Sequence, residues 1–179
     1  KFYSSENPDI DYFIITRENR LWIARTLLHL FKKLTFLVGH QHFYCMNFFI
    51  DTSAMALPNK NRYIAIELLS LIPVYNLNLI SEFHENNRWT REFLPNHPGP
   101  VNSKYLVPMR KSAFKGISRT IIDLLSPESL NRFLMKLTDL KWRRKWKKYG
   151  FSREEYERRF FSSEHISKNH PADYERKVK

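Results

Sequence analysis

Cysteine and glycine are scarce in this chain of 179 residues, which has one cysteine, Cys45, and four glycines. A single cysteine cannot form an internal disulfide, so the sequence excludes a disulfide-stapled secreted scaffold and favours a reducing, cytoplasmic compartment. No run of about 18 apolar residues occurs, so we expect no membrane span. Acidic residues are also in the minority, 18 against 30 lysines and arginines. The formal charge of +12 predicts anionic partners such as nucleotides, nucleic acid or an anionic membrane surface.

Apolar and aromatic residues are plentiful, at 42% and 15% of the chain. Such a composition can build a sizeable core, so we expect a folded protein with one domain, or one domain and a small appendage. The chain begins at Lys1 rather than at a methionine, and we therefore expect a fragment or a processed form.

The stretch from Asn7 to Thr16 carries the first chemical signal. Asn7-Pro8 favours a turn, and the β-branched and aromatic residues that follow predict a strand. Because strand side chains alternate, Asp9 and Asp11 point to the same side of the strand. Two adjacent carboxylates need a positive partner, and Mg²⁺ commonly takes one or two carboxylates plus substrate phosphates. A polar strand entry with two solvated aspartates has the same D-x-D tripeptide. This motif alone therefore does not distinguish a metal site from a solvated strand entry.

A helix and a second strand are predicted next. Apolar residues at three- and four-residue steps indicate a helix over 20–38, with Asn19 as its N-cap and Gly39 just past its end. The almost continuously apolar segment 43–51 is typical of a strand that is covered on both faces. A strand, a helix and a strand together predict one α/β unit.

The second strand offers candidates for a third metal ligand. Strict alternation would place Cys45, Asn47, Phe49 and Asp51 on one face. Asp51, or Asn47 on the same face, would then lie near the Asp9–Asp11 pair. The alternative for Asp51 is a residue that only ends the strand and starts a turn.

The rest of the chain reads as helices interrupted by one clear break. Three prolines and a glycine within residues 94–100 exclude a helix or a central strand, so we assign 94–108 to a linker. This break divides the chain into a region 1–93 and a basic helical region 109–179. Predicted helices cover 63–72, 77–93, 112–125, 128–148 and 152–161, the last with a Ser152/Glu155 capping box. The tail 162–179 is polar, and His170 lies in a turn.

One helix ends in a run of cations with two interleaved tryptophans. Cations between aromatic rings are typical of nucleic-acid surfaces, which would bind RNA or another polyanion. Trp142 and Trp146 are four residues apart and share a helix face, so the alternative is a solvated basic face with both rings docked on the core. An acidic membrane surface is also compatible. The cations are Lys141, Arg143, Arg144, Lys145, Lys147 and Lys148.

The motifs taken together resemble those of the nucleotidyltransferase superfamily with the polymerase-β-like fold. The similarity is greatest to bacterial nucleotidyltransferase-domain proteins of the Bacteroidetes type, and it covers nearly the whole chain. The segments that carry it are Pro8-Asp9-Ile10-Asp11-Tyr12-Phe13-Ile14-Ile15, Asn19-Arg20-Leu21-Trp22-Ile23-Ala24-Arg25-Thr26, Cys45-Met46-Asn47-Phe48-Phe49-Ile50-Asp51, Ile64-Ala65-Ile66-Glu67, Pro73-Val74-Tyr75-Asn76, Asn87-Arg88-Trp89, Leu94-Pro95-Asn96 and Ser167-Lys168-Asn169-His170-Pro171.

This resemblance implies an α+β fold, namely a truncated nucleotidyltransferase mixed sheet with a helical C-terminal region. It implies transfer of a nucleoside monophosphate from an NTP to an unidentified acceptor, with Asp9, Asp11 and Asp51 holding two Mg²⁺ ions. The family's third carboxylate usually sits within the strand, where this chain has Asn47. If neither acts, the fold is a degenerate module that binds nucleotide or RNA without turnover.

The family's Gly-Ser turn, which grips the triphosphate, is absent from the sequence. Lys1 corresponds to a lysine that often follows that turn and would contact the nucleotide. We therefore expect these 179 residues alone to be inactive.

Overall fold

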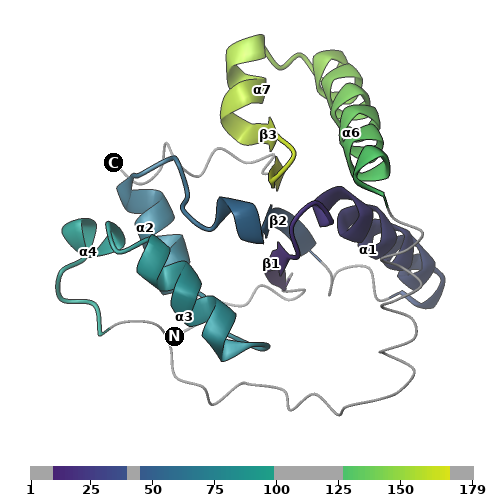
Figure 1. Cartoon of the computed structure of the whole chain (residues 1–179). Helices are drawn as coiled ribbons and strands as arrows, with labels where there is room; N and C mark the ends of the chain where they lie inside the picture. The colour runs from purple at the N-terminus through teal and green to yellow at the C-terminus, as the bar shows by residue number, and fades with distance from the viewer. Residues whose placement is uncertain (1–9, 40–44, 99–126, 170–179) are drawn as a thin grey trace, which may run out of the picture. The chain divides into compact units, whose positions relative to one another are not determined.

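The computed structural model describes residues 10–39, 45–98 and 127–169 (Figure 1). The fold is α+β, as the sequence predicts. The chain divides into two compact units, residues 1–53 with 122–172 and residues 54–121 with 173–179. This division differs from the predicted one because the helices and strands of residues 128–169 pack with the first two strands. Of the helices that the structure describes, none is long and apolar enough to cross a bilayer.

The first unit is built on a four-stranded mixed sheet in the order β1-β2-β4-β3. β1 (Asp11–Thr16) and β2 (Cys45–Asp51) are parallel, and α1 (Leu21–Thr35) connects them, which confirms the predicted strand–helix–strand unit. β3 (Phe160–Ser162) and β4 (Ile166–Asn169) form an antiparallel hairpin, and β4 also pairs antiparallel with β2. The sequence did not predict this hairpin, since strands of three and four residues are too short to show a period.

A bulge interrupts the pairing of β1 with β2. Tyr12 pairs with Met46 but Phe13 pairs with Phe48, so β2 carries one extra residue, Asn47, at this point. A bulge leaves its extra residue out of the ladder and re-aims the side chains around it. Beyond the bulge, the aromatic rings of Phe13 and Phe48 stack with centroids 5.3 Å apart.

The bulge changes which side chains share a face of β2. Met46 and Phe49 are three residues apart, yet both are buried in the same core cluster. The prediction that Cys45, Asn47, Phe49 and Asp51 share one face is therefore wrong. The extra residue shifts the alternation, so Phe49 joins Met46 on the face that packs against α1.

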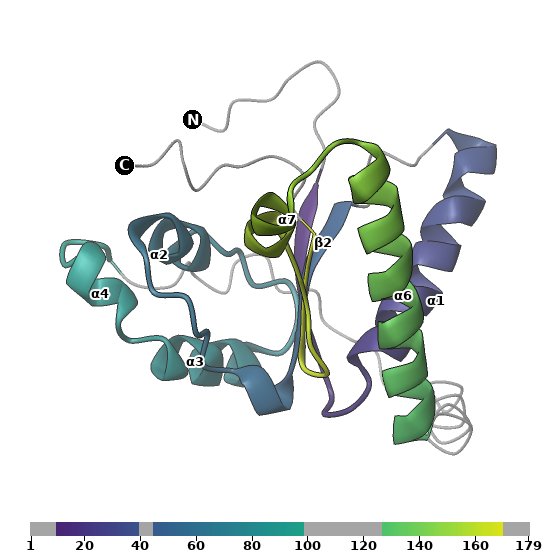
Figure 2. The same ribbon diagram turned by 90° about the horizontal axis from the view of Figure 1, so that it is seen from above.

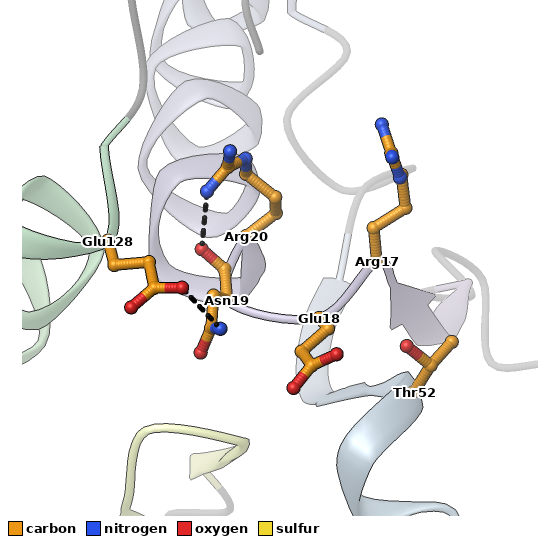
Figure 3. A pocket seen from close by; sticks show the side chains of 6 residues that line it. All are labelled: Arg17, Glu18, Asn19, Arg20, Thr52 and Glu128. Carbon is orange, nitrogen blue, oxygen red and sulfur yellow. Dashed lines mark hydrogen bonds between the residues drawn. The ribbon is translucent and has the colours of Figure 1, made fainter. Parts of the chain in front are cut away.

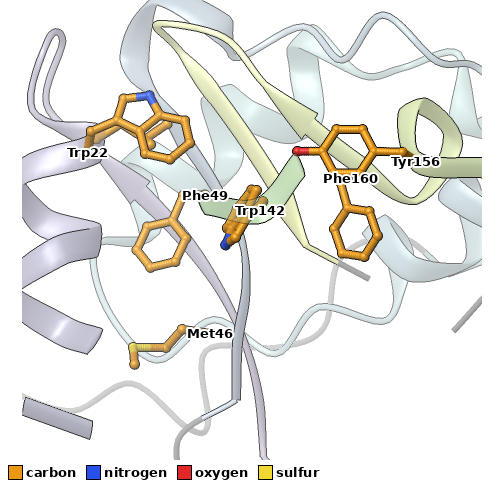
Figure 4. Packing of buried hydrophobic residues seen from close by; sticks show 7 residues of the cluster. Trp22, Met46, Phe49, Trp142, Tyr156 and Phe160 are labelled. Carbon is orange, nitrogen blue, oxygen red and sulfur yellow. The ribbon is translucent and has the colours of Figure 1, made fainter. Parts of the chain in front are cut away.

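That core lies between the sheet and two helices. α1 and α6 (Glu128–Lys148) are in contact, and Figure 2 shows them side by side. Trp22 and Trp142 meet between them with ring centroids 6.1 Å apart, and both rings lie near Phe49 (Figure 4). The buried cluster consists of Leu21, Trp22, Met46, Phe49, Trp142, Tyr156 and Phe160.

Polar contacts fix the start of α1. Arg20 rather than the predicted Asn19 is the N-cap, and Asn19 adopts a left-handed conformation with φ 56°. The Trp22 amide donates to the buried side chain of Asn131 over 2.8 Å, and the Trp22 indole donates to the Ser163 carbonyl over 2.8 Å. These bonds tie the first turn of α1 to α6 and to the β3–β4 turn.

The predicted helix ends are largely confirmed. Gly39 ends the 3₁₀ turn Phe36–Val38 after α1 in the left-handed conformation, at φ 71°. α6 has the predicted bounds, and Pro127 is its N-cap. α7 (Arg153–Arg159) begins with the predicted capping box of Ser152 and Glu155.

The second unit contains α2 (Arg62–Leu69), α3 (Leu77–Asn86) and α4 (Thr90–Phe93). The predicted single helix 77–93 breaks at Asn87, which is 1% exposed. The Asn87 amide donates to the carbonyls of Met55 and Phe83, and its oxygen accepts from the Leu57 amide and the Trp89 indole. This saturated amide gives the Asn87-Arg88-Trp89 motif a structural role.

Candidate functional site

Asp11 stands at the start of β1, where its side chain is exposed. Its Cα partner in the ladder is Cys45, the first residue of β2. The bulge residue Asn47 donates from Nδ2 to Asp11 Oδ1 over 3.0 Å and lies 3.0 Å from Cys45 Sγ. The structure therefore brings together Asp11 and Asn47, two of the residues that the sequence singles out.

Cys45 reports on the charge at this end of the sheet. Burial raises the pKa of its thiol, and the hydrogen bond and the negative charge of Asp11 raise the pKa further. The bond from Asn47 and the charge of Lys32 act in the opposite direction. Burial and Asp11 thus both disfavour the thiolate form of Cys45.

Asp9 and Lys1 lie outside the described residues, as do His170 and the segment 94–108 beyond residue 98. Within residues 10–39, 45–98 and 127–169, no group of three or more His, Cys, Asp or Glu side chains could hold a metal ion. An Asp11 carboxylate and an Asn47 amide oxygen are nevertheless hard oxygen ligands of the kind that Mg²⁺ prefers.

Asp51 is at the other end of β2 and is completely buried. Its Oδ1 accepts from the Ser53 amide over 2.9 Å. Its Oδ2 accepts from the Asn19 amide over 3.0 Å and from Nδ1 of His165 over 2.8 Å. Asp51 also donates its own amide to the His165 carbonyl. Through these three N–H donors the carboxylate joins the start of α1, the end of β2 and the β3–β4 turn.

The structure does not bring Asp51 to Asp11. Asp11 pairs with the first residue of β2, whereas Asp51 is the last and pairs with Thr16. Six residues of strand correspond to roughly 20 Å. The bulge also places the two side chains on different faces, since Asp51 contacts the first turn of α1 while Asp11 contacts Asn47. A single metal cluster cannot span that separation, whereas Asn47 lies beside Asp11.

A polar cavity of about 420 Å³ opens beyond the carboxyl ends of β1 and β2 (Figure 3). In open α/β sheets this is the usual place for a ligand. Asn19 Nδ2 donates to Glu128 Oε1 over 3.1 Å, and Arg20 donates to the Asn19 carbonyl. Two arginines and two glutamates balance the charge of the lining. The lining residues are Arg17, Glu18, Asn19, Arg20, Thr52 and Glu128.

At the basic end of α6, the tryptophan rings and the cations lie in different environments. Trp142 is 8% exposed in the core, and Trp146 stacks on Phe160 with centroids 4.8 Å apart (Figure 4 shows Trp142 and Phe160). Both tryptophans are thus docked on the core, in agreement with the predicted alternative of a solvated basic face with both rings packed inward. The six cations of this run are all exposed. Arg143 bonds to Asp139 over 2.7 Å, which raises its pKa.

Sequence reasoning missed His165, which binds Asp51 at the end of β2, and Asn131, which binds the first turn of α1. His165 lies in a segment that reads only as a polar tail, and Asn131 lies in an ordinary amphipathic helix. A polar residue at a core-facing position of that helix is the only signal that pointed to Asn131.

Comparison with known proteins finds no match: no family model, no curated protein and no solved structure is similar to this chain.

Proposed function

We propose that the protein is a Mg²⁺-dependent nucleotidyltransferase of the polymerase-β-like fold, acting in the cytoplasm at the Asp9–Asp11 end of β1. The observation that carries the proposal is the exposed Asp11 carboxylate with Asn47 hydrogen-bonded to it across a bulge. Bulges often occur beside active sites, where they re-aim a side chain. The parallel strand–helix–strand unit supports the same proposal, since the family that the sequence motifs resemble has such a unit.

In this proposal Asp9 and Asp11 carry the negative charge that holds the metal, and Asn47 takes the place of the third ligand. Asp51 is not a metal ligand in this proposal and keeps its structural hydrogen bonds. Bound Mg²⁺ would supply charge neutralisation at the NTP phosphates. Positioning of the acceptor and the nucleotide supplies most of the rate in such displacements. Lys1, in the segment before Asp9, would contact the triphosphate.

Pyrophosphate release tests the proposal directly. The longest natural form of the protein is incubated with each NTP, with Mg²⁺ and with EDTA, and pyrophosphate is measured. We expect Mg²⁺-dependent release that Asp11→Asn abolishes and Asn47→Ala weakens. Asp139→Asn on α6 is the matched control, because it removes one carboxylate from a surface that carries no part of the proposed site. Release that survives Asp11→Asn would sink the proposal.

A non-catalytic nucleotide- or RNA-binding module is the second candidate. It is favoured by the structural use of Asp51, which leaves Asp11 as the only carboxylate described at its end of the sheet. The exposed cations of α6 offer phosphate contacts. If this candidate holds, the protein binds RNA without Mg²⁺, affinity falls with salt, and a triple Arg144/Lys147/Lys148→Ala variant loses most of the binding.

A further inference from the structure

Arg25 is a buried cation with no counter-ion among the residues that the structure describes. It projects from α1 and is 2% exposed. None of its three guanidinium nitrogens has a hydrogen-bond partner in the part of the chain that the structure describes. Burying an ionised group without a paired charge and hydrogen bonds is costly, so this arrangement requires an explanation.

Aromatic rings provide part of the compensation. The guanidinium carbon lies 4.8 Å from the ring centroids of both Phe49 and Trp142, and 6.0 Å from that of Trp22. Ring faces attract cations, but they do not accept five N–H bonds. Because Trp142 belongs to α6, the guanidinium lies in the seam between α1 and α6. Its unused donors are therefore in that seam.

The same seam collects four further basic groups. His29 and Lys32 follow Arg25 on α1 and are half-buried, while Lys33 and Lys141 are exposed. Burial, together with the charges of Arg25, Lys32, Lys141 and Lys33, lowers the pKa of His29 to about 4. Burial also lowers the pKa of Arg25 to about 9. Cations from both α1 and α6 thus act on His29.

We propose that the seam between α1 and α6 is a phosphate-binding site, with Lys32, His29 and Lys141 at its entrance and Arg25 at its inner end. A phosphate group carries the negative charge that Arg25 finds on no described residue, and its oxygens match the donor fork of a guanidinium. Lys32 and Lys141 carry the charge at the entrance and meet the phosphate first, because His29 is uncharged at neutral pH and Arg25 is almost inaccessible. The site does not rest on the nucleotidyltransferase proposal, since it uses neither Asp9, Asp11 nor Mg²⁺.

Thermal unfolding of the 179-residue chain tests this site. Inorganic phosphate and tripolyphosphate are compared with sodium chloride at matched ionic strength, without Mg²⁺. We expect the phosphates to raise the melting temperature in a concentration-dependent way beyond chloride, because a ligand that binds only the folded state stabilises it. Equal effects of chloride and phosphate would overturn the proposal.

Three variants locate the binding. Titration calorimetry should show that Lys141→Ala and Arg25→Met each weaken tripolyphosphate binding by about tenfold or more. Arg153→Met removes one charge from α7, where the side chain is 88% exposed, and should leave binding unchanged. Equal losses in all three variants would mean diffuse charge attraction and overturn the site. If Arg25→Met does not fold, Lys32→Ala with Lys141→Ala decides in the same way.

Competition distinguishes the sources of the phosphate. A labelled single-stranded RNA is titrated with tripolyphosphate. Mutual displacement that depends on Lys141 supports a common phosphate site for small phosphate esters and a nucleic-acid backbone. RNA binding that neither tripolyphosphate nor Lys141→Ala changes, with no tripolyphosphate binding in calorimetry, refutes the site.

Discussion

The two ends of the β1–β2 pair use an aspartate in opposite ways. At the far end Asp51 is completely buried and accepts three N–H bonds, from Asn19, Ser53 and His165. At the near end Asp11 is exposed, and one N–H donor from Asn47 reaches it. Hydrogen-bond acceptors that are fully used hold a fold together, whereas a carboxylate with open coordination can bind a cation. Residue type alone therefore does not separate a structural from a functional aspartate.

Replacing the two aspartates should give the largest contrast. Asp51→Asn puts an amide NH₂ where N–H donors already converge, so it should destabilise the protein by about 2–4 kcal/mol. Asp11→Asn should change the free energy of unfolding by less than about 0.5 kcal/mol. Urea unfolding followed by circular dichroism measures both. Similar losses for the two variants would break the distinction between the two ends.

His165 tests one of the three bonds to Asp51 by itself. His165→Ala leaves a buried carboxylate oxygen with one donor fewer, so we expect a loss of about 1–3 kcal/mol. His165→Asn keeps a donor near the position of Nδ1 and should recover part of the loss. The neighbouring Glu164→Ala is the control and should have little effect. No difference between His165→Ala and Glu164→Ala would show that the bond contributes nothing.

The reactivity of Cys45 should report on the charge at the near end. The pKa of this thiol is raised by burial and then by Asp11, so the reactive thiolate forms only at higher pH than usual. Asp11→Asn should shift the alkylation profile to lower pH and speed alkylation at pH 8 severalfold. Mg²⁺ should likewise speed alkylation of the wild type, and it should leave the alkylation rate of Asp11→Asn unchanged. Iodoacetamide kinetics against pH measure the shift, and an unchanged profile in Asp11→Asn would contradict it.

Replacing Asn47 should have the smallest effect, and it should change the alkylation rate of Cys45 in the direction opposite to that of Asp11→Asn. Its hydrogen bond to the sulfur lowers the pKa of Cys45, so Asn47→Ala should slow alkylation at pH 8 by about twofold. Thr52→Ala, at the far end of β2, is the control. Faster alkylation in Asn47→Ala would show that the amide shields the thiol rather than stabilising its anion.

The sequence predicts the local elements well because they depend on local signals. The apolar period of α1 and α6, the capping box at Ser152 and the turn at Gly39 are all read within a few residues. The α+β class follows from the order of such elements. The helical period also favoured docking of Trp142 and Trp146 on the core, where the structure has them.

The candidate site was harder to predict because it depends on register. One extra residue at Asn47 moves Phe49 to the other face, and nothing in an almost wholly apolar strand signals where a bulge occurs. Asp51 binds His165, which lies 114 residues further along the chain. No local sequence pattern reveals a contact between residues so far apart. Asp11 is predicted because two carboxylates around one strand residue are a local signal. The sequence leaves Asp51 and Asn47 open as its neighbour, and the register of the structure decides for Asn47.

The position of β4 between β2 and β3 affects how the protein is made on the ribosome. β2 is complete once residue 51 has emerged, but its antiparallel neighbour comes from Ile166–Asn169. At about 5–20 residues per second, the intervening synthesis takes on the order of ten seconds. During that interval one edge of β2 is unpaired and the Asp51 carboxylate lacks its imidazole donor, so the nascent chain presents a strand edge that can pair with other chains. We therefore expect chaperones that bind exposed strand edges to hold this chain until β4 has been synthesised.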